Sequence, residues 1–311
     1  MELSLPVVFI MGTTATGKTD AAAHLYDCFD VDIISVDSSL VYRGMDIGTA
    51  KPDAEFLLQY PHALVDVTHP NQTWSVADFY HHAFELIHNS IDNGRLPVLV
   101  GGTHFYFSAL EQGLAELPIA NPALRQQISQ EAARKGWPSL HAKLAALDVD
   151  SAKRIDIMDA QRIQRALEIV LESGKTVAEH NAQRKPGLPF PIVKLALAFS
   201  DRSYLHSRIE SRFDQMLQQG LEQEVQQLLA QGVDPFSPSM KMIGYRQMLQ
   251  FVEGQLTFEQ MREQCIAATR QLAKRQLTWL RNQANLIWWV DIGLKDRRFE
   301  SLATFIGQFL N

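Results

Sequence analysis

The sequence has 311 residues, of which 46% are hydrophobic and 21% are charged, and its formal net charge is −6. These proportions are typical of a globular protein and exclude a disordered chain, a coiled coil and a collagen-like repeat. The two cysteines, Cys28 and Cys265, cannot supply a disulfide framework, which favours the reducing cytoplasm. No run approaches the roughly 18 apolar residues of a membrane span, so we expect a soluble protein without a membrane partner.

The first hundred residues alternate short apolar runs with helical patterns. The apolar runs predict buried strands at residues 7–11, 32–36, 63–67 and 96–100. Strands that alternate with helices in this way predict an α/β fold built on a parallel sheet.

The middle of the chain lacks strand patterns. Three helical patterns follow one another at residues 121–135, 138–147 and 159–173. Asp159 is expected to cap the last of these helices and Gly174 to end it. We therefore predict an all-helical insertion at residues 114–185 in a core formed by residues 1–113 and 186–311.

Beyond a Pro/Gly-rich linker at residues 185–189, the α/β alternation resumes. Two further strands are predicted, at residues 192–199 and 286–291. Helical patterns cover residues 201–220, 221–231, 257–282 and 299–310.

A glycine-rich segment follows the first predicted strand and opens the next helix. The pattern G-x-x-x-x-G-K-[ST] is formed by Gly12, Thr13, Thr14, Ala15, Thr16, Gly17, Lys18 and Thr19. Backbone N–H groups of such a loop, and the positive end of the helix behind it, bind phosphates. Lys18 adds a charge near the terminal phosphate, and the Thr19 hydroxyl is placed to ligate Mg²⁺. The segment predicts a P-loop NTPase-like core with a diphosphate site and Mg²⁺ as cofactor.

Asp37 directly follows the second predicted strand. The carboxyl edge of a parallel sheet is where such folds bind ligands, so Asp37 is expected to face the P-loop. A carboxylate there can hold Mg²⁺ or act as a general base on a hydroxyl or an amine. A purely structural Asp that caps the following loop is the alternative.

Several classes of protein combine a P-loop with a nearby acid. A small-molecule kinase that uses ATP is the first candidate. A guanine-nucleotide switch is disfavoured because the chain has no Asn-Lys-x-Asp string, and a mechanical ATPase is weakened because no clear apolar strand ending in Asp-Glu follows the P-loop. A transferase is the remaining candidate, with the diphosphate as leaving group and a nucleic acid as acceptor.

The charge is divided unevenly along the chain. Residues 1–111 contain four Lys/Arg and fourteen Asp/Glu, a formal charge of −10, whereas the remaining 200 residues carry 25 basic and 21 acidic side chains, a charge of +4. A polyanion is therefore expected to meet the later part of the chain. Surfaces that vary without any such partner explain the split equally well.

Five segments together resemble the tRNA dimethylallyltransferase family. They are the P-loop, DSSLVYRGMDIGTAKP at residues 37–52, GGTHFY at 101–106, KMIGYR at 241–246 and TRQLAKRQLTWLR at 269–281. The segments occur in the order expected for the family and span most of the chain. Thr13 stands where Pro is common and Leu40 where Gln is common, but neither difference removes a charged group or a P-loop donor.

The resemblance implies a specific reaction. The P-loop is expected to hold dimethylallyl diphosphate rather than ATP, and the acceptor is N6 of the adenine next to the anticodon in tRNA. Asp37 is implied as the base that accepts the N6 proton, with Lys18 stabilising the leaving diphosphate. Thr103 and Arg125 are implied as contacts between the acceptor and the transferred group. The insertion is expected to grip the anticodon stem-loop.

The resemblance also assigns tRNA contacts to residues at six places in the sequence. These residues are Asp37, Ser38, Ser39, Leu40, Thr103, Arg125, Gln161, Arg162, Ile163, Gln164, Arg165, Lys241, Met242, Ile243, Gly244, Tyr245, Arg246, Lys274, Arg275, Gln276, Leu277, Thr278, Trp279, Leu280 and Arg281. The enzyme is expected to act as a monomer. A kinase that uses ATP stays the alternative.

The helix predicted at residues 257–282 has two distinct faces. One face is basic and carries Arg270, Lys274 and Arg281. The opposite face is expected to pack in the core and carries Met261, Ala268, Leu272 and Trp279. A basic face that is only solvated has the same pattern. In the insertion, Gln161 and Arg165 share a helix face opposite its apolar residues.

Overall fold

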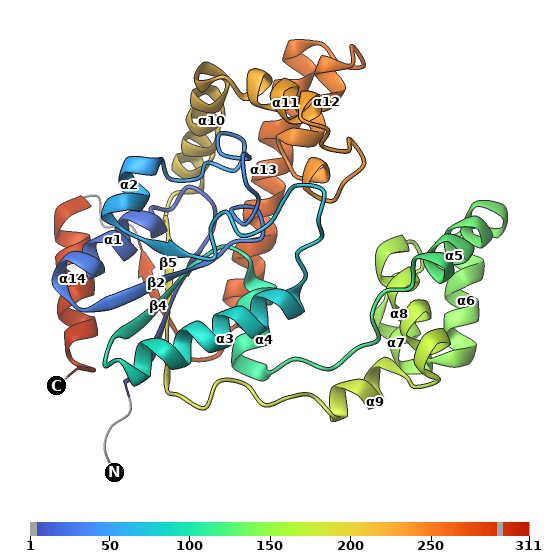
Figure 1. Ribbon diagram of the computed structural model, residues 1–311, viewed down its shortest axis with the longest axis horizontal. Coiled ribbons are helices and arrows are strands. Elements are labelled where there is room, and N and C mark those ends of the chain that lie inside the picture. The colour runs from blue at the N-terminus through green and yellow to red at the C-terminus, as the bar shows by residue number, and fades with distance from the viewer. Residues whose placement is uncertain (1–4, 291–294, 311) are drawn as a thin grey trace. The chain divides into compact units, whose positions relative to one another are not determined.

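The computed structural model describes residues 5–290 and 295–310 of the chain. The chain divides into two compact units, one formed by Met1–Glu111 with Leu188–Asn311 and the other by Gln112–Gly187 (Figure 1). The boundaries lie two residues outside those expected from the sequence. In the part of the chain that the structure describes, no helix is both long and apolar enough to cross a membrane.

The first unit is built on a six-stranded sheet with strand order β3-β2-β4-β1-β5-β6. Every neighbouring pair is parallel, which confirms the predicted α/β core with a parallel sheet. Strands β1, β2, β4 and most of β5 are buried, as expected when helices cover both faces of a sheet. The strands are β1 (Val7–Gly12), β2 (Val31–Val36), β3 (His62–Ala63), β4 (Leu96–Gly101), β5 (Ile192–Ala198) and β6 (Leu286–Val290).

Helices α1 (Lys18–Cys28) and α14 (Lys295–Gly307) lie side by side on one face of the sheet (Figure 1). Alternate β1 residues Val8 and Ile10 point into this core. Phe9 of β1 packs on Phe107 of α4 (His104–Gln112), on the opposite face, with ring centroids 4.9 Å apart. Helix α3 (Val76–Asp92) also contacts the sheet, against β2 and β4.

The strand predicted at residues 63–67 is only two residues long, so this prediction is wrong beyond Ala63. Leu64 and Asp66 adopt positive φ angles of 63° and 55°, which a strand does not allow. The backbone turns toward the loop after β2, where the Asp66 N–H donates to the Leu40 carbonyl at 3.1 Å. Long-range contacts of the backbone here override the local apolar pattern.

A second core lies among the later helices of the first unit and the loop after β2. Val41 and Met45 of that loop are buried together with residues of the helical segments. Thr257 and Gln260 form a capping box that starts the longest helix. These helices are α10 (Arg202–Gln219), α11 (Leu221–Ala230), α12 (Tyr245–Val252) and α13 (Phe258–Arg281), with a 3₁₀ turn at Ser239–Lys241. The short helix α2 (Ala54–Gln59) has no buried residue and is not part of this core.

The helices predicted at residues 201–220, 221–231 and 257–282 are thus confirmed within two residues. Helix α14 begins four residues before the expected start of the terminal helix. Asp291, the expected last residue of the final strand, lies outside the described residues.

The second unit is all-helical, as predicted, and has its own small core. Asp159 caps α8 by accepting a hydrogen bond from the Arg162 N–H, and Gly174 ends that helix with a φ of 70°. Ile163 and Leu167 of α8 are fully buried in the core of this unit. Its helices are α5 (Pro122–Lys135), α6 (Trp137–Leu147), α7 (Val149–Arg154), α8 (Ala160–Ser173) and α9 (Val177–Ala182).

Candidate active site

The glycine-rich loop joins β1 to α1 at the carboxyl edge of the sheet. Ala15 and Gly17 have φ angles of 65° and 80°, which curl the loop ahead of the helix. Thr16 Oγ1 and Lys18 Nζ both donate to the Thr13 carbonyl, at 2.9 and 2.7 Å. Gly17, the N-cap of α1, contributes no side-chain hydrogen bond, which leaves the first N–H groups of the helix to a bound anion.

Gln276 of α13 ties the loop to the sheet. Its Oε1 accepts from the Thr14 N–H at 3.1 Å, and its Nε2 donates to the Gly102 carbonyl at 2.9 Å. The side chain is only 9% exposed. Both ends of its amide thus serve the loop expected to hold the phosphates, and because Gln276 also lines the cavity, its contact with tRNA stays a prediction.

Lys18 is poised to change charge near neutral pH. Burial lowers its pKa to about 8, with Asp37 opposing this shift and Arg212 adding to it. Because the folded pKa lies below the unfolded value of 10.5, the unfolded chain binds more protons between about pH 8 and 10.5. In that window the contribution of Lys18 to stability rises with pH. The charge of Asp37 favours the charged form of Lys18, and a bound anion would favour it further.

We expect the affinity for inorganic diphosphate to fall above about pH 8, by up to tenfold per pH unit, because binding must then supply a proton to Lys18. Calorimetric titration of the protein with diphosphate from pH 7 to 10 measures this dependence. Lys18→Arg is the control, because its guanidinium stays charged throughout. Equal pH dependence in both proteins would show that Lys18 does not titrate on binding.

Asp37 and Thr103 meet where β2 and β4 end. Gly101 ends β4 so close to Val36 that a Cβ on Gly101 would lie 2.0 Å from the Val36 carbonyl oxygen. Thr103 Oγ1 accepts from the Ser38 N–H at 3.0 Å, and the Thr103 N–H donates to the Val36 carbonyl at 3.1 Å.

The Asp37 carboxylate is oriented from one side. Its Oδ1 accepts from the N–H and the hydroxyl of Ser39, at 2.9 and 2.5 Å. Both Asp37 and Thr103 line the same cavity as the P-loop. The predicted position of Asp37 at the sheet edge beside the P-loop is confirmed.

Two arginines of α10 complete the basic, anion-binding end of the site. Neither was predicted from the sequence. Arg208 Nε donates to the Ala15 carbonyl of the P-loop at 2.9 Å. Arg212 Nη2 donates to the Ala50 carbonyl over a long 3.4 Å, and burial lowers the pKa of Arg212 although Asp37 opposes this. Their i, i+4 spacing on a helix that also carries Leu205 and Ile209 in the core was the signal available in the sequence.

These residues surround one cavity of about 820 Å³. Four basic and two acidic side chains line it, so its charge suits an anion. The stacked rings of His104 and Trp279, 4.4 Å between centroids, form part of the wall, and burial together with the charge of Lys18 lowers the pKa of His104 to about 4. Apolar lining comes from Leu40, Val100, Phe105, Ile209, Phe213, Met216, Met242, Ile243 and Leu272.

The expected tRNA contacts of the first unit separate into exposed and buried residues. Tyr245 and Leu280 are fully buried, so direct contact of their side chains with tRNA is incompatible with the structure. Tyr245 packs in the second core instead. Exposed residues of the same segments are Ser38, Lys241, Arg246, Lys274, Arg275, Thr278 and Arg281.

The core face of α13 was predicted only in part. Met261 is buried as expected, but Leu272 and Trp279 are half-buried and line the cavity. On the basic face, Lys274 and Arg281 are exposed, whereas Arg270 Nη2 pairs with Glu210 Oε2 at 3.2 Å. One side of α13 packs in the core and another side lines the cavity. The division of the helix into one basic and one core face predicts only the first of these.

In the second unit, Arg125 is bound to Glu168 through two hydrogen bonds of 2.8 and 3.0 Å. Glu168 is 2% exposed, and Arg165 Nη1 approaches the same carboxylate at 3.4 Å. Gln161 and Arg162 are exposed at the start of α8. Ile163 is fully buried, so its expected side-chain contact with tRNA is wrong.

The fold and the cavity define a P-loop α/β protein whose site has a basic end suited to a diphosphate, an apolar wall, and Asp37 and Thr103 at the edge of the sheet. Comparison with known proteins defines this further. The sequence profile described as IPP transferase matches residues 40–283. The chain belongs to the IPP transferase family.

Individual relatives agree with this assignment. A tRNA dimethylallyltransferase of Thiobacillus denitrificans is 52% identical over 278 residues, 89% of either chain. The solved tRNA isopentenylpyrophosphate transferase of Bacillus halodurans is similar with a TM-score of 0.71 and 35% identity, over 98% of this chain and 96% of that one. A eukaryotic dimethylallyltransferase solved while acting on tRNA gives a TM-score of 0.81 at 26% identity, over 98% of this chain and 79% of that one.

Proposed function

We propose that this protein transfers the dimethylallyl group of dimethylallyl diphosphate to N6 of the adenosine next to the anticodon in tRNA and releases diphosphate. The observation that carries the proposal is one cavity in which the P-loop, an apolar wall and the Asp37–Thr103 corner meet. All three come from one chain, which supports a monomer. The tRNA substrate and the two free thiols support a cytoplasmic location.

The basic end of the cavity is suited to bind the leaving diphosphate. As the allylic C–O bond breaks, positive charge develops on the prenyl carbon and negative charge on the departing diphosphate. Lys18, Arg212 and the N–H groups at the start of α1 surround that position and stabilise the growing charge most strongly in the transition state.

The opposite corner serves the acceptor. An exocyclic adenine amine is a poor nucleophile because its lone pair is delocalised into the ring. N6 forms the new bond to the prenyl carbon and loses a proton, which Asp37 accepts. Ser39 holds the Asp37 carboxylate through Oδ1, and Thr103 is fixed beside it by Ser38. The adenine must leave its stack to enter the cavity, at a cost of a few kcal/mol.

The donor set fits Mg²⁺ bound together with the diphosphate. No group of three or more His, Cys, Asp or Glu among residues 5–290 and 295–310 could hold a metal by itself. Mg²⁺ usually binds through one or two protein oxygens plus substrate phosphates and waters. The Thr19 hydroxyl, which lines the cavity, is such an oxygen. The ion supplies charge neutralisation on the leaving diphosphate.

The acceptor atom can be tested with synthetic anticodon stem-loops. We expect prenyl transfer to a stem-loop with adenosine next to the anticodon, and none when inosine replaces it, because inosine carries an oxygen in place of the N6 amine. Nucleoside analysis after digestion locates the label. Equal labelling of both RNAs would show that the acceptor is another group.

The exposed basic face of α13 is proposed to contact tRNA phosphates. Lys274→Ala and Arg281→Ala should each weaken tRNA binding and lower the salt slope by roughly 0.7 to 0.9. Arg262→Ala is the charge-matched control on the same helix, because Arg262 pairs with Asp214 at 2.7 Å. Unchanged slopes for both Lys274→Ala and Arg281→Ala would mean that this face is only solvated.

A further inference from the structure

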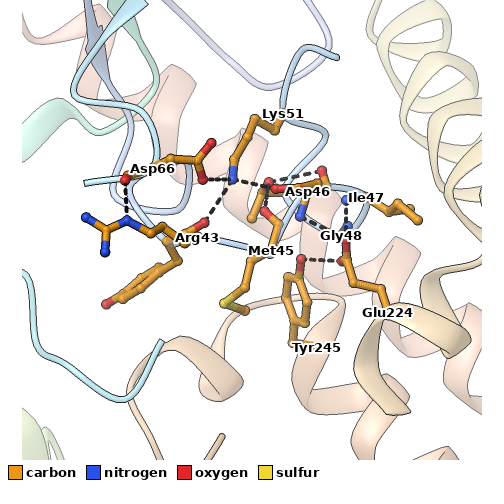
Figure 2. A network of polar contacts seen from close by, with 11 residues as sticks. Arg43, Met45, Asp46, Ile47, Gly48, Lys51, Asp66, Glu224 and Tyr245 are labelled. Atoms are coloured by element: carbon orange, nitrogen blue, oxygen red, sulfur yellow. Dashed lines mark hydrogen bonds and ion pairs between the residues drawn. The ribbon is translucent and has the colours of Figure 1, made fainter. Parts of the chain in front are cut away.

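A buried carboxylate outside all five family segments connects two of them. Glu224 lies on α11 and is 8% exposed. Its Oε2 accepts from the N–H groups of Asp46 and Ile47, at 2.8 and 2.7 Å, and its Oε1 from that of Gly48 at 3.0 Å. The Tyr245 hydroxyl donates to Oε1 at 2.6 Å (Figure 2). Four donors from two separate segments thus meet on one side chain.

These contacts fix a segment that has no regular secondary structure. Three successive N–H groups converge on the Glu224 carboxylate, which has only acceptor oxygens and therefore suits such a set of donors. Gly48 packs so tightly that a Cβ there would lie 2.6 Å from ring carbons of Tyr245. On its other side, Lys51 Nζ contacts the carboxylates of Asp46 and Asp66 (Figure 2). Contacts on both sides therefore hold the backbone of this segment.

The same segment continues directly into the wall of the active-site cavity. Gly48, Thr49 and Ala50 line the cavity. The Ala50 carbonyl accepts the hydrogen bond from Arg212, which also lines the cavity. The Ala50 N–H donates to the Ile47 carbonyl at 2.9 Å, so a displacement of residues 46–48 also displaces the carbonyl that Arg212 contacts.

We propose that Glu224 is a positioning residue for the diphosphate end of the site. It holds residues 46–48 and, through Ala50, places Arg212 against the leaving diphosphate. This inference rests on the proposed function only for the identity of the prenyl substrate, since the contacts themselves concern the binding of a diphosphate. It also explains why two sequence segments so far apart, at residues 37–52 and 241–246, lie together.

The test is the affinity of the full chain for inorganic diphosphate, measured by calorimetry, beside its affinity for tRNA. Glu224→Gln keeps the size of the side chain but turns one acceptor into a donor facing N–H groups. We expect it to weaken diphosphate binding about tenfold, the scale of one lost hydrogen bond to a charged group, and to leave tRNA affinity unchanged. Glu222→Gln removes the same charge from the same turn of α11 and should change neither affinity.

Two further variants separate positioning from folding. Arg212→Lys alone and combined with Glu224→Gln should give non-additive losses of diphosphate affinity, because both disturb one contact. Should Glu224→Gln fail to fold, Gly48→Ala displaces the same segment from the opposite side and is expected to weaken diphosphate binding as well. Unchanged diphosphate affinity in the folded variant, or fully additive losses, would overturn the role of Glu224. Normal diphosphate binding by a wild type that transfers no prenyl group would refute the proposed function instead.

Discussion

Asp37→Asn is expected to slow prenyl transfer about a hundredfold or more, the usual scale for a general base, while both substrates bind with near-normal affinity. The structure explains the separation of these effects. Oδ1 of Asp37 is occupied by Ser39, and an Asn carbonyl can keep those hydrogen bonds. The amide cannot accept the N6 proton at neutral pH. The measurement is the single-turnover rate with saturating tRNA.

The metal role of Asp37 predicts a different result for the same variant. If the carboxylate were an essential Mg²⁺ ligand, diphosphate-substrate affinity measured at several Mg²⁺ concentrations would fall strongly in Asp37→Asn. Such a loss would make our assignment of the base wrong. Ser39→Ala removes only one orienting hydrogen bond and should reduce the rate far less than Asp37→Asn.

Lys18→Ala should reduce the rate of transfer by about two to three orders of magnitude, the scale reported for the loss of one preorganised donor to a developing anion. The ammonium lies over the P-loop, bonded to the Thr13 carbonyl, and has no role in the exposed face of α13. tRNA affinity should therefore change little. Burial disfavours the charged form of Lys18, so thermal stability should not fall.

Parallel measurements of turnover, tRNA affinity and melting temperature check this division. Loss of tRNA binding in Lys18→Ala would contradict it, because the P-loop would then contribute to the RNA site. A large drop in melting temperature would instead identify Lys18 as a structural cation.

The parts of the site that the sequence predicted are those encoded locally. The P-loop is a contiguous pattern between a strand and a helix, and Asp37 directly follows a buried strand, so the parallel sheet brings them to one edge. Arg208, Arg212 and Glu224 come from helices whose approach to that edge depends on tertiary packing. Their local sequence resembles that of any amphipathic helix.

Contacts between distant segments also explain features that the sequence patterns do not show. Gln276 lies in a segment associated with RNA, and nothing in its neighbours shows that its amide bridges Thr14 and Gly102. The pattern at residues 63–67 is apolar, but Asp66 turns toward Lys51 and the loop after β2. Buried polar contacts between distant segments decide both cases, and they leave no periodic signature.

We propose that the P-loop of this protein holds a prenyl diphosphate and that the prenyl group is delivered to RNA. The direct measurement is incubation of the protein with tRNA and either dimethylallyl diphosphate labelled in the prenyl group or ATP labelled in the γ-phosphate. We expect label in the tRNA from dimethylallyl diphosphate and none from ATP. Phosphate transferred from ATP to any acceptor, with no label in tRNA from the prenyl diphosphate, would contradict the account and identify a kinase.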